Sequence, residues 1–168
     1  GIEKRIGFDA GVSVADVNND GFLDIYINRA GWYTGDEKLA NMLYINNGDL
    51  TFTERAEEYG LAETNRSIAS TFFDYDKDGD LDVYIANTPA EFGLSGKIID
   101  LEKIKQRDET KSFRGSDKLY NNDGHGHFTD VSEAAGIVPD LGFGLNAQVG
   151  DLNNDGWPDI YVSNDFIG

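Results

Sequence analysis

The chain has 168 residues, of which 39% are hydrophobic and 12% aromatic, so it is long and apolar enough to fold around a core. Its formal net charge of −17 argues against nucleic acid or an anionic membrane as a partner. The absence of cysteine excludes disulfides, thiolate zinc sites and iron–sulfur clusters. No stretch predicts a transmembrane helix, so we expect no membrane insertion, and any export signal would lie outside this segment.

The first predicted element is a strand, Gly11 to Asp16, that leads into an acidic loop, Asp16 to Asp24. The loop has the pattern D-x-[ND]-x-D-G-x-x-D, and a short run of β-branched and aromatic residues follows it. The same loop recurs at Asp74 to Asp82 and at Asp151 to Asp159. Each copy is preceded by a predicted strand, at residues 67–74 and 146–151.

These three loops have the chemistry of a hard-cation site. Oxygen-bearing side chains occupy the first, third, fifth and ninth positions, and glycine at the sixth allows a sharp turn that brings them together. The seventh residue is expected to contribute its carbonyl oxygen. Many carboxylates on a flexible loop suit Ca²⁺ better than Mg²⁺, so we predict three Ca²⁺ sites. The predicted ligands are Asp16, Asn18, Asp20, Phe22 and Asp24; Asp74, Asp76, Asp78, Asp80 and Asp82; and Asp151, Asn153, Asp155, Trp157 and Asp159.

EF-hand and dockerin loops open in the same way, but they need a ligand at the twelfth position and run into a helix. The twelfth residues here are Ile27, Ile85 and Val162, which cannot bind a metal. The residues that follow each loop favour a strand instead. We therefore expect each loop to close on its ninth residue. We also expect calcium to hold the structure together, because the loop would otherwise be a cluster of repelling carboxylates.

A second repeated block, Leu43 to Leu61, matches Leu119 to Ile137 without a gap. Each copy predicts a strand, a turn at Asn47-Gly48 or Asp123-Gly124, and a second strand, because Asn-Gly and Asp-Gly are strong hairpin signals. Each repeating unit thus contains four predicted strands.

This periodicity predicts an all-β fold of β-propeller blades, each with four antiparallel strands and a calcium loop between its first two strands. Blade one would cover about residues 10–61, blade two about 67–137 with an insertion at 88–116, and a third blade would start at about 144–168. The chain would hold about two and a half blades of a longer array. Its own polypeptide or other copies of the chain would complete the array.

The repeated blocks carry a family resemblance. The stretches VADVNNDGFLDIYIN, LYINNGDLTFTERAEEYGL and LYNNDGHGHFTDVSEAAGI resemble the FG-GAP/VCBS repeats of bacterial surface proteins, above all the arrays of proteins that also carry an ASPIC/UnbV module. The resemblance implies an integrin-α-like propeller with calcium in these loops. The FG…GAP signature is only loosely echoed at residues 87–90, so integrin-type ligand recognition is not carried over, and the ASPIC/UnbV module itself is absent.

In an up-and-down blade the calcium loops and the Asn-Gly hairpins lie on one face, and the longer connections lie on the opposite face. Long loops on a rigid scaffold are where binding usually resides. We therefore predict that a protein or glycan partner binds the face opposite the calcium loops, with Trp32, Tyr33 and Phe92 as candidate contacts.

The sequence shows no nucleophile–base pair, phosphate-binding loop or other catalytic constellation, so we expect a binding, adhesion or assembly module and not an enzyme. Calcium loops of this kind are useful where calcium is plentiful, which favours an extracellular or cell-surface location. The alternative is a blade set from a secreted carbohydrate-active enzyme, similar to a polysaccharide lyase, whose catalytic residues lie outside this segment.

Overall fold

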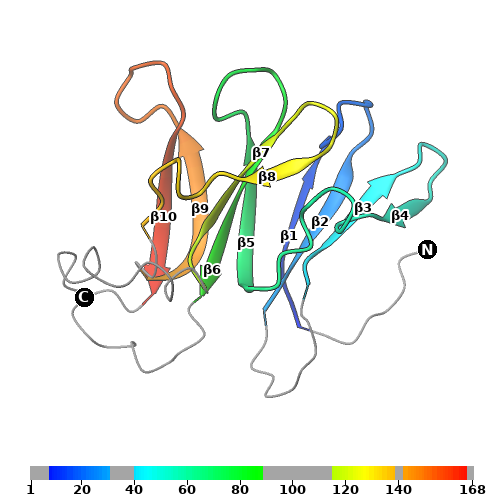
Figure 1. Cartoon of the computed structure of the whole chain (residues 1–168), viewed down its shortest axis with the longest axis horizontal. Coiled ribbons are helices and arrows are strands. Elements are labelled where there is room, and N and C mark those ends of the chain that lie inside the picture. Colours follow the sequence, from blue (N-terminus) through cyan, green and yellow to red (C-terminus); the bar gives the residue numbers. More distant parts are fainter. Residues whose placement is uncertain (1–7, 31–39, 89–114, 139–141, 166–168) are drawn as a thin grey trace.

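The computed structural model describes residues 8–30, 40–88, 115–138 and 142–165. Ten strands form within these ranges, and none of the described residues is helical (Figure 1). The strands are β1 (Asp9–Ala15), β2 (Asp24–Arg29), β3 (Met42–Asn46), β4 (Phe52–Glu54), β5 (Arg66–Phe73), β6 (Asp82–Thr88), β7 (Lys118–Asn122), β8 (Phe128–Asp130), β9 (Phe143–Gly150) and β10 (Asp159–Asp165).

Two sheets contain four antiparallel strands each, in the orders β1-β2-β3-β4 and β5-β6-β7-β8, and a third pairs β9 with β10. We call the first two sheets blade one and blade two. The pairing repeats between them, because Tyr26 faces Leu43 in blade one as Tyr84 faces Leu119 in blade two. This arrangement confirms the predicted all-β fold class of four-stranded antiparallel blades.

The sheets stand side by side with their faces against each other (Figure 1), and the core lies between them. Successive side chains of a strand point to opposite faces of its sheet. In β6, Val83 and Ile85 join the core shared with blade one, while Tyr84 and Ala86 join the core shared with β9 and β10. This position between two cores explains why the residues after the second acidic loop form a continuous apolar run.

Hydrogen bonds also connect neighbouring sheets. The Asn122 side chain of β7 donates to the carbonyl oxygen of Val17 in the first acidic loop at 3.0 Å. The Phe128 amide donates to the carbonyl oxygen of Tyr59 at 2.8 Å, and the Thr71 hydroxyl donates to that of Ala147 at 2.8 Å. Such bonds fix how each sheet sits against the next.

The predicted contacts Trp32, Tyr33 and Phe92 and most of the predicted insertion lie outside the described residues. Among the residues that are described, no helix is both long and apolar enough to cross a membrane.

Gly11 of β1 packs directly against the backbone of β5 in blade two. A methyl group at Gly11 would lie 2.4 Å from the Ile68 carbonyl oxygen of β5, where backbone has to move to relieve the overlap. Gly11→Ala should therefore lower the free energy of unfolding by about 1–3 kcal/mol, measured by urea denaturation. Gly150→Ala is the matched control, because nothing lies within 4 Å of the added methyl, and it should leave stability nearly unchanged. Equal stability of the two variants would contradict this packing.

Candidate metal-binding loops

The three acidic loops lie at the same end of their sheets, where β1, β5 and β9 turn into β2, β6 and β10 (Figure 1). The β3–β4 and β7–β8 hairpins lie at this end as well, and they contact the loops. The Asn46 side chain donates to the Leu23 carbonyl at 3.1 Å, and the Asn122 side chain donates to the Leu81 carbonyl at 3.1 Å. The predicted placement of loops and hairpins on one face is confirmed.

The first aspartate of each loop organises the turn. The two carboxylate oxygens of Asp16 accept hydrogen bonds from the amides of Asp20 and Gly21, at 3.0 and 2.8 Å. Asp74 and Asp151 accept the equivalent pairs of bonds in the other loops. The sixth residues, all glycine, have φ values of 87°, 98° and 87°, a conformation that other residues rarely adopt.

The aspartate at the fifth position of each loop also stabilises the turn. Its carboxylate accepts the amide of the seventh residue, at 2.8 Å for Asp20 with Phe22, 3.2 Å for Asp78 with Asp80 and 2.8 Å for Asp155 with Trp157. The side chains predicted to bind the metal therefore also hydrogen-bond to the backbone of their own loop. These bonds stabilise the turn without a bound cation.

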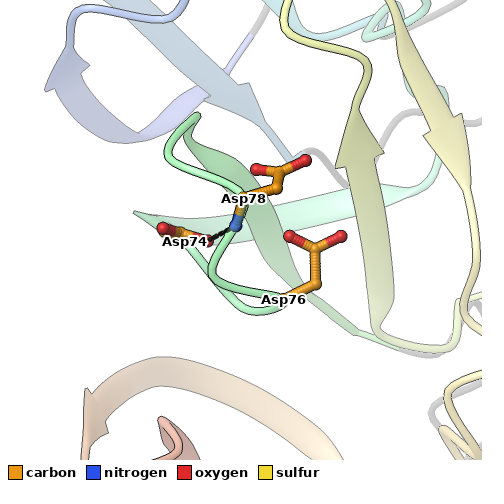
Figure 2. Close-up of side chains that lie close together, drawn as sticks. All are labelled: Asp74, Asp76 and Asp78. Carbon is orange, nitrogen blue, oxygen red and sulfur yellow. Dashed lines mark hydrogen bonds between the residues drawn. The ribbon is translucent and has the colours of Figure 1, made fainter.

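In the second loop these side chains form one cluster. Asp74, Asp76 and Asp78 each offer a carboxylate oxygen, and the three oxygens lie within 4.8 Å of one another. Figure 2 shows the three carboxylates on the loop between β5 and β6, with the Asp78 amide bonded to Asp74. Oxygen ligands this close together fit a hard cation such as Ca²⁺ and repel one another without it.

The first and third loops carry asparagine where the second has Asp76. The amides of Asn18 and Asn153 donate to Asp20 and Asp155 at 2.9 Å, so each loop replaces one carboxylate repulsion with a hydrogen bond. Asp76 instead accepts a bond from the side chain of Asn121 at 3.0 Å, contributed by β7. The second loop is thus the most acidic, and a neighbouring strand supports it.

The ninth aspartate anchors the loop to the sheet. Asp24 and Asp82 are 1% and 0% exposed. Each accepts the amide of the second loop residue, from Val17 at 3.0 Å or Tyr75 at 2.9 Å. Each also accepts an amide from the third strand of its blade, from Asn46 at 2.8 Å or Asn122 at 2.9 Å. Asp159 of the third loop accepts the Leu152 amide at 2.8 Å.

The structure therefore gives the ninth aspartate a role that the ligand pattern did not predict. It does not place Asp82 in the three-carboxylate cluster. Sequence reasoning also missed Asn46 and Asn122, which bond both to this aspartate and to the carbonyl before it. Their signal was available, because they occupy the same position in the two repeated hairpin blocks.

The second loop holds carboxylates in an unfavourable environment. Burial raises the pKa of Asp82 to about 6, against the opposing effect of its backbone hydrogen bonds. Burial, with the nearby charges of Asp78 and Asp82, raises the pKa of Asp80 to about 6. Asp80 is 7% exposed, and its Oδ1 is buried without a hydrogen-bond partner. A cation or a proton would relieve this excess negative charge.

A cation–π contact joins the second and third loops. The Nζ of Lys77 lies 4.2 Å from the centroid of the Trp157 ring. The hydrogen bonds from the Trp157 amide and the Asn153 side chain lower the pKa of Asp155, and the nearby charge of Lys77 acts in the same direction. Because Trp157 belongs to one loop and Lys77 to the other, a rearrangement of either loop alters the environment of this tryptophan.

Comparison with known proteins adds the family relationship. A family model described as FG-GAP-like repeat matches residues 29–85 and 110–162, which together make up more than half of the chain. Each match covers the third and fourth strands of one sheet and continues through the first strand and acidic loop of the next sheet into the start of its second strand. A search among curated proteins found no match. The FG-GAP part of the resemblance is confirmed, and the link to proteins with an ASPIC/UnbV module stays a prediction.

The raised pKa values predict how the metal-free protein responds to pH. A carboxyl group whose pKa is higher in the folded state than in the unfolded state binds protons more tightly when folded. The free energy of unfolding should therefore fall as the pH rises from about 4 through about 6. Urea denaturation in metal-free buffer at pH 4.5, 5.5 and 7 would measure this fall.

Asp80→Asn should remove part of the pH dependence and raise the Tm at pH 7 by about 3 °C, because it removes an unpaired buried charge while keeping the backbone carbonyl. If the free energy of unfolding of the wild-type chain does not change between pH 4 and 6, the raised pKa values of Asp80 and Asp82 are contradicted.

Proposed function

Because the chain belongs to the family of FG-GAP-like repeat proteins, we propose that it is part of an extracellular calcium-binding β-propeller that acts as a binding or assembly module. FG-GAP repeats are often extracellular binding or adhesion modules. The observation that supports the calcium proposal is the second loop, where carboxylate oxygens of Asp74, Asp76 and Asp78 lie within 4.8 Å of one another.

The residues present fit Ca²⁺ better than a transition metal. The donors are carboxylate, amide and carbonyl oxygens, with no thiolate and no imidazole among the ligands predicted. Asp74, Asp76 and Asp78 would supply carboxylate oxygens, and Asp80 would supply its carbonyl. The bound ion would offset the mutual repulsion of these groups, which Asp82 and the buried Asp80 increase.

The proposed role of calcium is structural, because the loops are connected to more than their own strands. The Val17 carbonyl of the first loop accepts a hydrogen bond from Asn122 of blade two. Lys77 of the second loop lies on Trp157 of the third. Holding a loop in one conformation therefore also holds the contact between neighbouring blades, and the rigid array presents its opposite face to a protein or glycan partner.

Calorimetric titration of the metal-free chain with CaCl₂ tests this proposal. We expect three binding events per chain, with the tightest at the second loop, since it has one more carboxylate among its proposed ligands than the other loops have. Asp76→Asn gives the second loop the same proposed side-chain ligands as the first and third loops, so it should weaken the tightest event by about tenfold. Asn18→Asp is the reciprocal variant and should strengthen binding at the first loop.

Asp80→Asn is the control, because it changes a side chain of the same loop that is not proposed as a ligand and should keep three binding events. The proposal is wrong if the folded wild-type chain releases or absorbs no heat of binding, or if Asp76→Asn leaves every site unchanged.

A further inference from the structure

A cavity of about 190 Å³ lies at the boundary between blade two and the β9–β10 pair. We call it the interblade pocket. Its lining includes the polar groups of Tyr84, Asp117 and Asn164 and the apolar side chains of Ile137, Val138 and Val162. Asp117 immediately precedes β7, and Asn164 lies near the end of β10, so the pocket is at the end of the sheets opposite the acidic loops.

The boundary between blades one and two has the same construction. Asn41 immediately precedes β3, as Asp117 precedes β7. The Arg29 amide donates to Asn41 at 2.8 Å, and the Asn87 amide donates to Asp117 at 2.7 Å. Tyr26 shares a hydrogen bond of 3.0 Å with Asn41, and Tyr84 donates one of 2.7 Å to Asp117. The two boundaries can therefore be compared residue by residue.

The first boundary contains a hydrogen-bonded serine that the second boundary lacks. The Ser67 hydroxyl accepts a bond from Asn41 at 2.8 Å and donates to Asn87 at 2.8 Å. Ser67 pairs with Asn87 across its sheet, and the equivalent pair in the next sheet is Gly144 with Asn164. No hydroxyl therefore reaches Asp117 from this position. Leu61 is fully buried in the first boundary, whereas Ile137, its equivalent in the repeated block, is partly exposed.

The two boundaries also differ in the residue just before the third strand. The first has Asn41, with a neutral amide, and the second has Asp117, with a carboxylate. Asp117 accepts hydrogen bonds from two neutral donors, the Tyr84 hydroxyl and the Asn87 amide. No cationic side chain in the described part of the chain pairs with it. A carboxylate has about four acceptor positions, so Asp117 retains capacity for another donor. Burial raises the pKa of this carboxyl, as expected for a charge that lacks a cationic partner.

We propose that the interblade pocket binds a short alkyl cation, with the ammonium or guanidinium group on Asp117 and the alkyl chain against Ile137, Val138 and Val162. A cavity of 190 Å³ is smaller than the roughly 300–1,000 Å³ typical of sites for drug-sized ligands, so it suits a group the size of one side chain. A free alkylamine and a lysine side chain of a partner protein share this chemistry. The pocket contains no residue of the acidic loops, so this proposal does not depend on the calcium proposal.

Methyl-detected NMR of the full chain tests the proposal, with n-butylammonium as the free amine and Nα-acetyl-lysine methylamide as the blocked side chain. We expect n-butylammonium to shift the methyl signals of Ile137, Val138 and Val162 with a Kd of about 1 mM. 1-Butanol, which has the same length and no charge, should bind at least tenfold more weakly. Binding of the blocked lysine as well would indicate that the pocket admits a protein side chain, whereas binding of the free amine alone would indicate a small-molecule site.

Asp117→Asn is the matched variant, since Asn41 shows that an amide is accommodated in this position. It should keep the far-UV circular dichroism spectrum and the Tm and lose at least tenfold in affinity for n-butylammonium. Three results would overturn the proposal: no methyl shifts at 20-fold excess over the expected Kd of about 1 mM, shifts located away from the pocket, or equal binding of the amine and the alcohol. If the variant fails to fold, the comparison of amine with alcohol on the wild-type chain still decides.

Discussion

The structure depends above all on the buried aspartate that ends each acidic loop in the two complete blades. Asp24 and Asp82 use one carboxylate oxygen to fix the loop and the other to fix the third strand of the blade. A carboxylate removed from water is costly unless hydrogen bonds replace its hydration. Because those bonds come from backbone amides in separate elements, this one side chain ties the loop, the strand after it and the hairpin into a single unit.

The two ends of the sheets differ in how closely the repeats resemble one another. At the loop end the repeats agree closely, with the same turn geometry and the same braces from the first and fifth aspartates. At the opposite end equivalent positions have diverged, as Ser67 and Asn41 of one boundary become Gly144 and Asp117 of the next. The loop end is therefore the constant end of the sheets, and the opposite end is where the two boundaries differ in their side chains.

Much of this architecture could be predicted from the sequence, because the repeats supply an internal alignment. The β-branched runs after Asp24, Asp82 and Asp159 gave the second strands, and Asn47-Gly48 and Asp123-Gly124 gave the hairpins. The loops and their placement on one face followed from the alternation of antiparallel strands. These features are local, so the chain encodes them within a few residues.

The features that could not be predicted depend on contacts between distant segments. The ligand pattern treats the ninth aspartate as one donor among several, whereas its burial becomes visible only when the third strand is placed beside it. Asp80 is buried because it lies beside Gly124, which belongs to the β7–β8 hairpin. Tyr161 has the same sequence position as Tyr26 and Tyr84, which are buried because each packs against the next sheet. It is 65% exposed, since no further described sheet covers this face of β10.

The central claim is that calcium holds the acidic loops and, through them, the array of blades. It is tested most directly by thermal unfolding of the metal-free chain in chelator, in excess MgCl₂ and in excess CaCl₂, followed by far-UV circular dichroism. A ligand that binds the folded state at 100 times its Kd stabilises that state by about 2.7 kcal/mol per site. We therefore predict a Tm at least about 5 °C higher in calcium than in chelator, with little change in magnesium. A β-sheet spectrum with the same Tm in all three solutions would contradict the account.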